Sequence, residues 1–94
     1  MQPFTLPSKY PAEIVKGLYV DFKNRFVEGE TVASCTVTTV PAGMATNVEY
    51  LGTVVSWDAS GGNAKDKITF TISATGTEGS KRIAQATMSV VAQS

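Results

Sequence analysis

The 94-residue sequence contains no histidine, and its only cysteine is Cys35. Without more Cys or His side chains, one chain does not supply the ligands of a structural zinc site. Activation of a Ser or Cys nucleophile by an imidazole base is excluded as well. A single cysteine forms no intrachain disulfide, which is compatible with folding in a reducing compartment. We therefore expect neither a metal site nor a cofactor.

An excess of charge of either sign is also missing, because eight Lys and Arg residues balance eight Asp and Glu residues. Proteins that hold nucleic acid or an anionic membrane surface by electrostatics carry a positive excess. We therefore expect no nucleic acid and no membrane as a partner. A net charge near zero also removes one safeguard against self-association, which suits a chain that works in an assembly.

Long apolar runs are absent from the sequence. None approaches the roughly 20 residues that a membrane-spanning helix needs. The N-terminal stretch MQPFTLPSKYP lacks the charged, apolar and small-residue regions of a signal peptide. We expect synthesis and folding in a cytoplasm.

Helix signals are scarce, whereas apolar and polar residues alternate along most of the chain. The best helix candidate, PAEIVKGL, stops at Gly17 within about two turns. In contrast, DKITFTISATGTEGSKRIAQATMSVV alternates with a period of two on both sides of a turn that contains Gly76 and Gly79. This pattern predicts a hairpin with one packed face and one solvated Ser/Thr face. The residues predicted to face the core are Ile68, Phe70, Ile72, Ala74, Ala84, Ala86, Met88 and Val90.

The same period recurs upstream, with strands predicted near residues 18–23, 30–40, 46–51 and 53–58. Turn residues separate these strands at regular intervals. About six to seven short antiparallel strands predict an all-β fold, a β-sandwich that forms a single domain of residues 14–94. Its expected inward side chains are Leu18, Val20, Phe22, Val55 and Trp57, together with Cys35 on one face with Ala33 and Val37.

Residues 1–13 stand apart as an extended arm, because Pro3, Pro7 and Pro11 prevent regular ladder hydrogen bonding. Two interpretations are open: the arm closes one end of its own sandwich, or it docks on a neighbouring subunit. Tyr19 and Tyr50 are aromatic residues that we expect at the surface. The candidate partner-contact residues are Phe4, Leu6, Tyr10, Tyr19 and Tyr50.

Candidate chemistry is sparse. Asp58 and Asp66 flank a Gly-rich turn, where they would form a carboxylate pair or, with Asn63, bind calcium. Aspartates in such turns more often bond to the backbone or to solvent. The segment GTEGSK lacks the full phosphate-binding pattern and leads into a strand, so a hairpin turn explains it better. We expect no catalytic residue and no enzymatic activity.

Short motifs lie along both halves of the chain. The first half carries Phe, then Lys-x-Pro-x-Glu, Tyr-x-Asp-Phe and Gly-Glu-Thr followed by an aliphatic residue; these residues are Phe4, Lys9, Pro11, Glu13, Tyr19, Asp21, Phe22, Gly29, Glu30, Thr31 and Val32. The second half carries a Gly-Gly turn at Gly61 and Gly62, an alternating strand that closes at Thr75, a turn glycine at Gly79, and Arg82 at the start of the last strand. In these motifs the chain resembles small structural proteins of tailed bacteriophages and prophages, a fiber-tail adaptor-like family. It departs from the family pattern in the turn GGNAKDK, which lacks a third glycine and an aromatic residue.

This resemblance implies an immunoglobulin-like, non-enzymatic structural protein of the virion, made in the bacterial host cytoplasm. Its implied role is an adaptor or connector that links the portal or tail to fibers. The expected partners are other virion proteins, namely portal or connector, tail or fiber proteins, in a ring-like multi-copy assembly. Two alternatives remain: a capsid decoration or cement protein, and a free carbohydrate- or protein-binding module, which requires an exposed aromatic cluster on one face.

Overall fold

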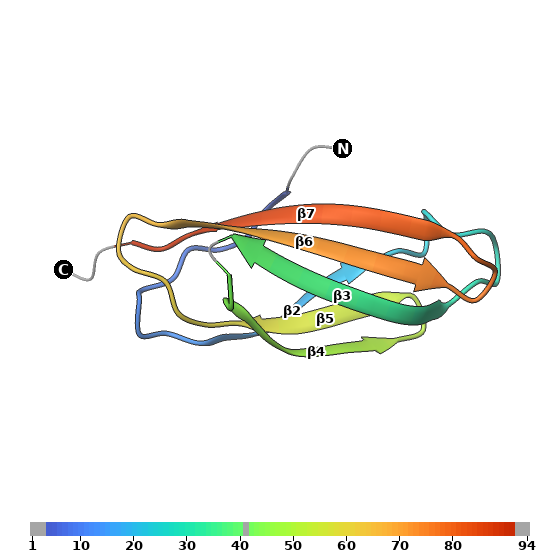
Figure 1. Cartoon of the computed structure of the whole chain (residues 1–94), viewed down its shortest axis with the longest axis horizontal. Helices are drawn as coiled ribbons and strands as arrows, with labels where there is room; N and C mark the ends of the chain where they lie inside the picture. Colours follow the sequence, from blue (N-terminus) through green and yellow to red (C-terminus); the bar gives the residue numbers. More distant parts are fainter. Residues whose placement is uncertain (1–3, 41, 92–94) are drawn as a thin grey trace.

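A computed structural model describes residues 4–40 and 42–91, and within them seven strands form two sheets (Figure 1). No helix that could cross a membrane occurs in this part of the chain. The fold is all-β, as the alternating pattern predicts. The strands are β1 (Phe4–Thr5), β2 (Val15–Asp21), β3 (Val32–Val40), β4 (Ala45–Leu51), β5 (Val54–Ala59), β6 (Lys67–Gly76) and β7 (Lys81–Ser89).

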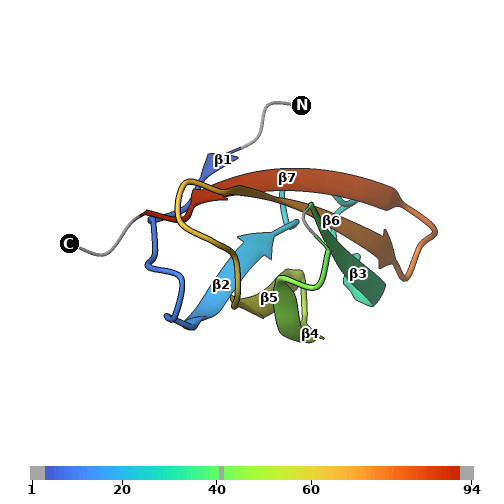
Figure 2. The ribbon, with the colours of Figure 1, turned by 60° about the vertical axis from the view of Figure 1, so that its left-hand side comes forward.

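The two sheets have the strand order of an immunoglobulin-like sandwich. One sheet has the order β1-β7-β6-β3 and the other has the order β2-β5-β4. In immunoglobulin nomenclature these correspond to A-G-F-C and B-E-D, with the first strand paired to the last one instead of the second. The two layers and the position of β1 beside β7 are visible in Figure 2. All strand pairs are antiparallel except β1 and β7, which are parallel.

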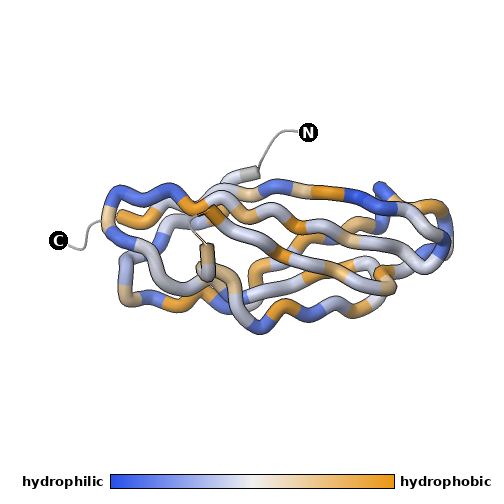
Figure 3. Tube along the Cα trace, in the orientation of Figure 1, coloured by the Kyte–Doolittle hydropathy of each residue, from blue (hydrophilic) through white to orange (hydrophobic). Residues whose placement is uncertain are grey.

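The core lies between the sheets and is built by the alternating faces. Figure 3 shows hydrophobic and hydrophilic positions succeeding one another along the strands. All eight residues predicted to face the core from β6, β7 and the position after β7 are buried. Across the core, the rings of Trp57 on β5 and Phe70 on β6 lie 5.7 Å apart. Leu18, Phe22 and Val55 are also buried, and Val20 packs against them.

One inward prediction is wrong in detail, because β3 begins with a bulge. Val32 pairs with Gly76 but Ser34 already pairs with Thr75, so one extra residue, Ala33, is inserted. The bulge changes the alternation, and Ala33 is exposed although it stands two positions from Cys35. Cys35 and Val37 follow the bulge and pack against the core.

The arm lies along its own sandwich. Leu6 donates its N–H to the carbonyl of Thr87 at 2.7 Å, and Lys9 donates to the carbonyl of Ser89 at 3.1 Å. Val91 in turn donates to the carbonyl of Lys9 at 2.9 Å. Residues 4–9 therefore extend the edge of β7, so this part of the arm packs on its own chain, along a sheet edge and not across one end of the sandwich.

Candidate functional site

Three connections meet at one end of the sandwich, on the right in Figure 1. They are the β2–β3 loop (residues 22–31), the β4–β5 turn (residues 52–53) and the β6–β7 turn (residues 77–80), and we call them together the loop end. Backbone hydrogen bonds tie them: Phe22 donates to the carbonyl of Thr53 at 2.8 Å, and Thr77 donates to that of Thr31 at 2.8 Å. In immunoglobulin-like sandwiches such clustered loops carry binding functions.

A buried carboxylate organises the loop end. Glu30 is only 2% exposed. Its Oε2 accepts the backbone N–H groups of Glu78 at 2.7 Å and Ser80 at 3.2 Å, and its Oε1 accepts that of Val27 at 3.3 Å. One side chain of the β2–β3 loop thus holds the β6–β7 turn and the loop itself in place.

Gly76 is required by this carboxylate. A Cβ atom at position 76 would overlap the carboxyl group of Glu30. Gly76 does not have a positive φ, whereas Gly79 in the following turn has a φ of 91°. Gly76 ends β6, is buried, and leaves room for the side chain that fixes the turn after it.

The Glu30 carboxylate is ionised at neutral pH. Burial alone raises its pKa, but hydrogen bonds from the Ser80 hydroxyl and from the N–H groups of Glu78, Ser80 and Val27 outweigh burial and hold the pKa below its ordinary value. Both of its oxygens are occupied by these donors. The group is suited to holding loops, and less suited to donating a proton.

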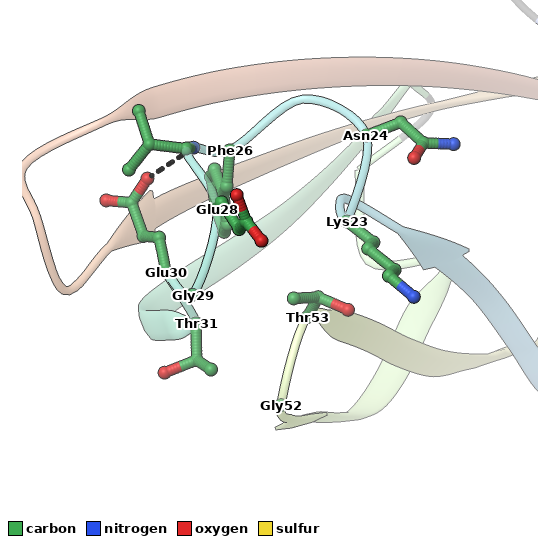
Figure 4. A pocket seen from close by; sticks show the side chains of 10 residues that line it. Lys23, Asn24, Phe26, Glu28, Gly29, Glu30, Thr31, Gly52 and Thr53 are labelled. Atoms are coloured by element: carbon green, nitrogen blue, oxygen red, sulfur yellow. Dashed lines mark hydrogen bonds between the residues drawn. The ribbon is translucent and has the colours of Figure 1, made fainter.

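A pocket of about 580 Å³ lies between the β2–β3 loop and the β4–β5 turn (Figure 4). It combines apolar walls with polar groups, because Phe26 and Val27 share it with Lys23, Asn24 and Glu28. In Figure 4 the Glu30 carboxylate is bonded to the N–H of Val27. Apolar walls with a few polar groups are typical of ligand pockets in general. The remaining lining residues are Gly29, Glu30, Thr31, Gly52 and Thr53.

Asp21 fixes the other wall of this pocket. Its Oδ1 accepts the hydroxyl of Thr53 at 2.6 Å and the N–H of Lys23 at 2.9 Å. These two hydrogen bonds lower the pKa of Asp21. The carboxylate joins the end of β2 to the β4–β5 turn, so its role is also positional.

Asp58 has a comparable role in the sheet β2-β5-β4. Both edge strands of this sheet contain a bulge, near Gly17 in β2 and near Asn47 in β4. Asp58 stands between them on β5, and its Oδ1 accepts the N–H of Gly17 at 3.1 Å while its Oδ2 accepts the Asn47 side-chain amide at 2.9 Å. Both bonds lower the pKa of Asp58, and the bond from Asn47 has the larger effect. One carboxylate on the central strand is thus bonded to the bulges of both neighbouring strands.

We expect Asp58→Ala to lower the melting temperature by about 5 °C, because both bulges lose the group that bonds them. Asp58→Asn keeps one acceptor oxygen and should lose less. Asn47→Gly serves as the matched control, since it keeps the positive φ of 52° accessible and removes only one of the two bonds. Thermal unfolding followed by circular dichroism measures all three. An unchanged melting temperature in Asp58→Ala would contradict this assignment.

The proposed carboxylate pair and calcium site find no support in the geometry. Asp66 accepts the N–H of Asn63 at 2.8 Å, a bond within its own turn, whereas Asp58 bonds to β2 and β4. In residues 4–40 and 42–91, no three His, Cys, Asp or Glu side chains gather where they would hold a metal ion. Cys35 is half-buried, and burial raises the pKa of its thiol, which keeps the thiol protonated at neutral pH.

The five candidate contact residues do not form one surface. Phe4 belongs to β1, and its side chain lies outside the described part; Leu6 packs against the core; Tyr10 is an exposed residue of the arm. Tyr19 pairs with Ser56 on the outer face of β2-β5-β4 and is 63% exposed. Tyr50 pairs with Val55, a core residue, and donates its hydroxyl to the carbonyl of Ala33 at 2.8 Å.

Tyr19 does have apolar neighbours on its face that sequence reasoning missed. Leu51, which is 86% exposed, pairs with Val54. Val54 pairs with Asp21 on β2 and lies two positions from Ser56, the partner of Tyr19, so Val54 is a diagonal neighbour of Tyr19. We call Tyr19, Leu51 and Val54 the outer patch. Alternation alone did not reveal it, because the patch joins three strands, and the alternation within one strand does not say which strands become its neighbours.

Lys9 was also missed. It is 1% exposed, and its ammonium donates to the carbonyls of Tyr10, Pro11 and Glu13 at 3.1, 3.3 and 3.0 Å. Glu13 closes the same turn by accepting the N–H of Tyr10 at 2.6 Å. The Lys-x-Pro-x-Glu motif therefore builds the turn that ends the arm. The motif was the one available signal, since a buried lysine is otherwise rare.

Comparisons with known proteins add little. No family model matches the chain, and no curated protein matches it. Among solved structures, the chain is similar to a 2,6-sialyltransferase of a Photobacterium species in complex with CMP and lactose, with 15% identity and a TM-score of 0.45. The match covers 96% of this chain and 18% of that enzyme's chain. A likeness of this degree carries no argument about what this chain does.

Proposed function

We propose that the chain is a non-enzymatic structural protein of a tailed-phage particle, an adaptor or connector component between the portal or tail and the fibers. The sequence resemblance supplies the virion context. The observation that carries the adaptor role is the outer patch, because an exposed apolar patch on a small soluble domain marks a protein contact. Leu51 and Tyr19 are among the most exposed large apolar side chains of the described residues.

The chemistry of the carboxylates supports a structural role. Asp21, Glu30 and Asp58 all accept hydrogen bonds from loops or bulges, and these bonds lower their pKa values. Each is therefore committed to holding a segment of the sandwich. A sandwich whose loops and bulges are bonded by carboxylates, with an apolar patch on one sheet, suits a structural protein that contacts a neighbour.

The copy number in purified particles tests this function. Quantitative mass spectrometry against the portal and the major capsid protein should give a count near that of the portal ring, on the order of a dozen or a small multiple of it. A copy number close to that of the major capsid protein would instead support the alternative of a capsid decoration or cement protein. Absence from purified particles would overturn the virion role.

Replacing the outer patch should reduce incorporation. We expect Tyr19→Ser combined with Leu51→Ser to lower the copy number by at least about tenfold, because central apolar residues carry most of an interface's binding energy. Thr71→Ser, on the other sheet, is the matched control. Circular dichroism of the purified variants checks that the sandwich is retained. Normal incorporation of a folded double variant would exclude the patch as the contact.

A further inference from the structure

The sandwich has four sheet edges, and three of them carry a feature that hinders pairing with another chain. An unpaired edge strand offers free N–H and C=O groups, so soluble proteins usually protect it with bulges, short strands, charges or covering loops. In the sheet β2-β5-β4, both edge strands are interrupted by the bulges that Asp58 holds. Neither offers a regular ladder over its whole length.

The β1 side of the larger sheet is protected as well. The arm covers the second half of β7 through the two-residue strand β1 and the bridge between Lys9 and Val90. The first half is covered by the β2–β3 loop, where the Arg25 guanidinium donates to the carbonyl of Ile83 at 3.0 Å and Arg82 donates to the carbonyl of Arg25 at 2.8 Å. Two separate segments thus occupy this edge.

The fourth edge, β3, is different. Its bulge lies at the start, and from Ser34 to Val40 the register with β6 runs without interruption. The strand VASCTVTTV contains no charged residue, no proline and no glycine. Among the described residues, no strand pairs with β3 on the side away from β6. Near the start of the strand, Val32 donates its N–H to the carbonyl of Gly52, and the Tyr50 hydroxyl donates to the carbonyl of Ala33. Near its end, the N–H of Met44 donates to the Thr39 hydroxyl at 3.0 Å.

A small pocket of about 260 Å³ lies at the distal half of this edge. Val37, Thr38 and Thr39 of β3 form one side of it, and Ala42, Gly43 and Ala45 form the other. Its lining is uncharged. An added strand would therefore find both a ladder of backbone groups and room for an apolar side chain beside them.

We propose that the β3 edge binds the β3 edge of a second copy of this chain, antiparallel and about a twofold axis at Val37. The uninterrupted stretch Ser34–Val40 pairs along its whole length with the same stretch of the second copy only if the axis passes through its middle residue, Val37. The pairing then sets Thr36 opposite Thr38 of the second copy, and no like charges face each other, because the strand has none. The two larger sheets join into one continuous eight-stranded sheet. This dimer does not depend on the virion role.

Sedimentation equilibrium of the purified full chain tests the proposal. The wild-type chain should form a dimer with micromolar affinity, because a single strand pair buries a small interface. Thr36→Lys with Thr38→Lys should weaken the dimer at least about 100-fold, since four lysines then meet across the axis. Thr36→Glu with Thr38→Glu should do the same. Mixing the two double variants should restore a dimer, which separates charge repulsion from misfolding.

Thr69→Lys with Thr71→Lys is the matched control, because these residues lie on the same outer face but on the inner strand β6. This variant should still dimerise. A wild-type chain that stays monomeric would overturn the proposal and leave the edge to a strand of a different protein. A dimer that survives the lysine pair on β3, a loss of the dimer in the β6 control, or no dimer on mixing would also overturn it.

Discussion

Replacing Glu30 with alanine should lower the melting temperature of this domain by at least about 10 °C. The substitution leaves the N–H groups of Val27, Glu78 and Ser80 without their acceptor, two of them in the turn that joins β6 to β7. Breaking a hydrogen-bond network around a buried side chain is among the few causes of large losses in stability, and Glu30 is 2% exposed. Thermal unfolding by circular dichroism measures the effect.

Glu28→Ala is the matched control, because Glu28 is an exposed glutamate of the same loop and its loss should shift the melting temperature by less than about 2 °C. Gly76→Ala should be destabilising in the wild-type chain and less so in the Glu30→Ala background, since the clash involves the missing carboxylate. Equal melting temperatures for the two glutamate variants would refute the role of Glu30.

The pH dependence follows from the same group. The pKa of Glu30 is lower in the folded chain than its ordinary value of 4.5, so the unfolded chain binds the proton more tightly. Its contribution to stability is therefore complete above about pH 4.5 and is lost as the pH falls through the lower, folded value. Asp21 and Asp58 act in the same direction. The melting temperature should fall on acidification, and less steeply in Glu30→Ala.

The second large effect is expected for Lys9→Met, which should cost about 2 kcal/mol of unfolding free energy. Methionine keeps the apolar stem but removes the three hydrogen bonds that the ammonium donates to the turn after the arm. Because this turn positions the arm on β7, the amides of Leu6 and Val91 should exchange with solvent faster. Denaturant unfolding and amide hydrogen exchange measure the two effects.

Lys9→Ala should cost more than Lys9→Met, because it also removes the buried stem. Lys67→Met is the control, since Lys67 is exposed at the start of β6. If Lys9→Met matched the wild type in both stability and amide exchange, the ammonium would have no part in holding the arm. Faster exchange at Leu6 alone, with Val91 unchanged, would limit the role of Lys9 to the arm's first residues.

The strands and the core were predictable because alternation is a local property. A period of two places Ile72 and Ala84 on the packed face whatever the distant chain does, and both are buried. The exception was Ala33, where a bulge shifts the alternation by one residue. A bulge exists only in relation to the paired strand. The local sequence pattern therefore does not predict which face of the sheet a residue at a bulge will occupy.

The candidate sites were far less predictable, because their partners are backbone groups distant in the sequence. The donors to Glu30 in the β6–β7 turn lie 48 and 50 positions away, and Asp58 accepts from Gly17, 41 positions away. Sequence reasoning placed Asp58 in a possible carboxylate pair and gave Glu30 no role of its own. Nothing in the side-chain types distinguishes a carboxylate that holds a loop from one that is solvated.

By itself, the sequence determined the class of this protein: an all-β sandwich, one packed face per strand, and no histidine or cysteine pair for metal or disulfide chemistry. The tertiary structure alone decided that Lys9 and Glu30 are buried, that Tyr19, Leu51 and Val54 lie on one face, and that β3 is an edge strand with a regular register from Ser34 to Val40. The physical reason is that side-chain alternation follows from the backbone of each strand, whereas burial of charge and exposure of edges follow from which strands become neighbours.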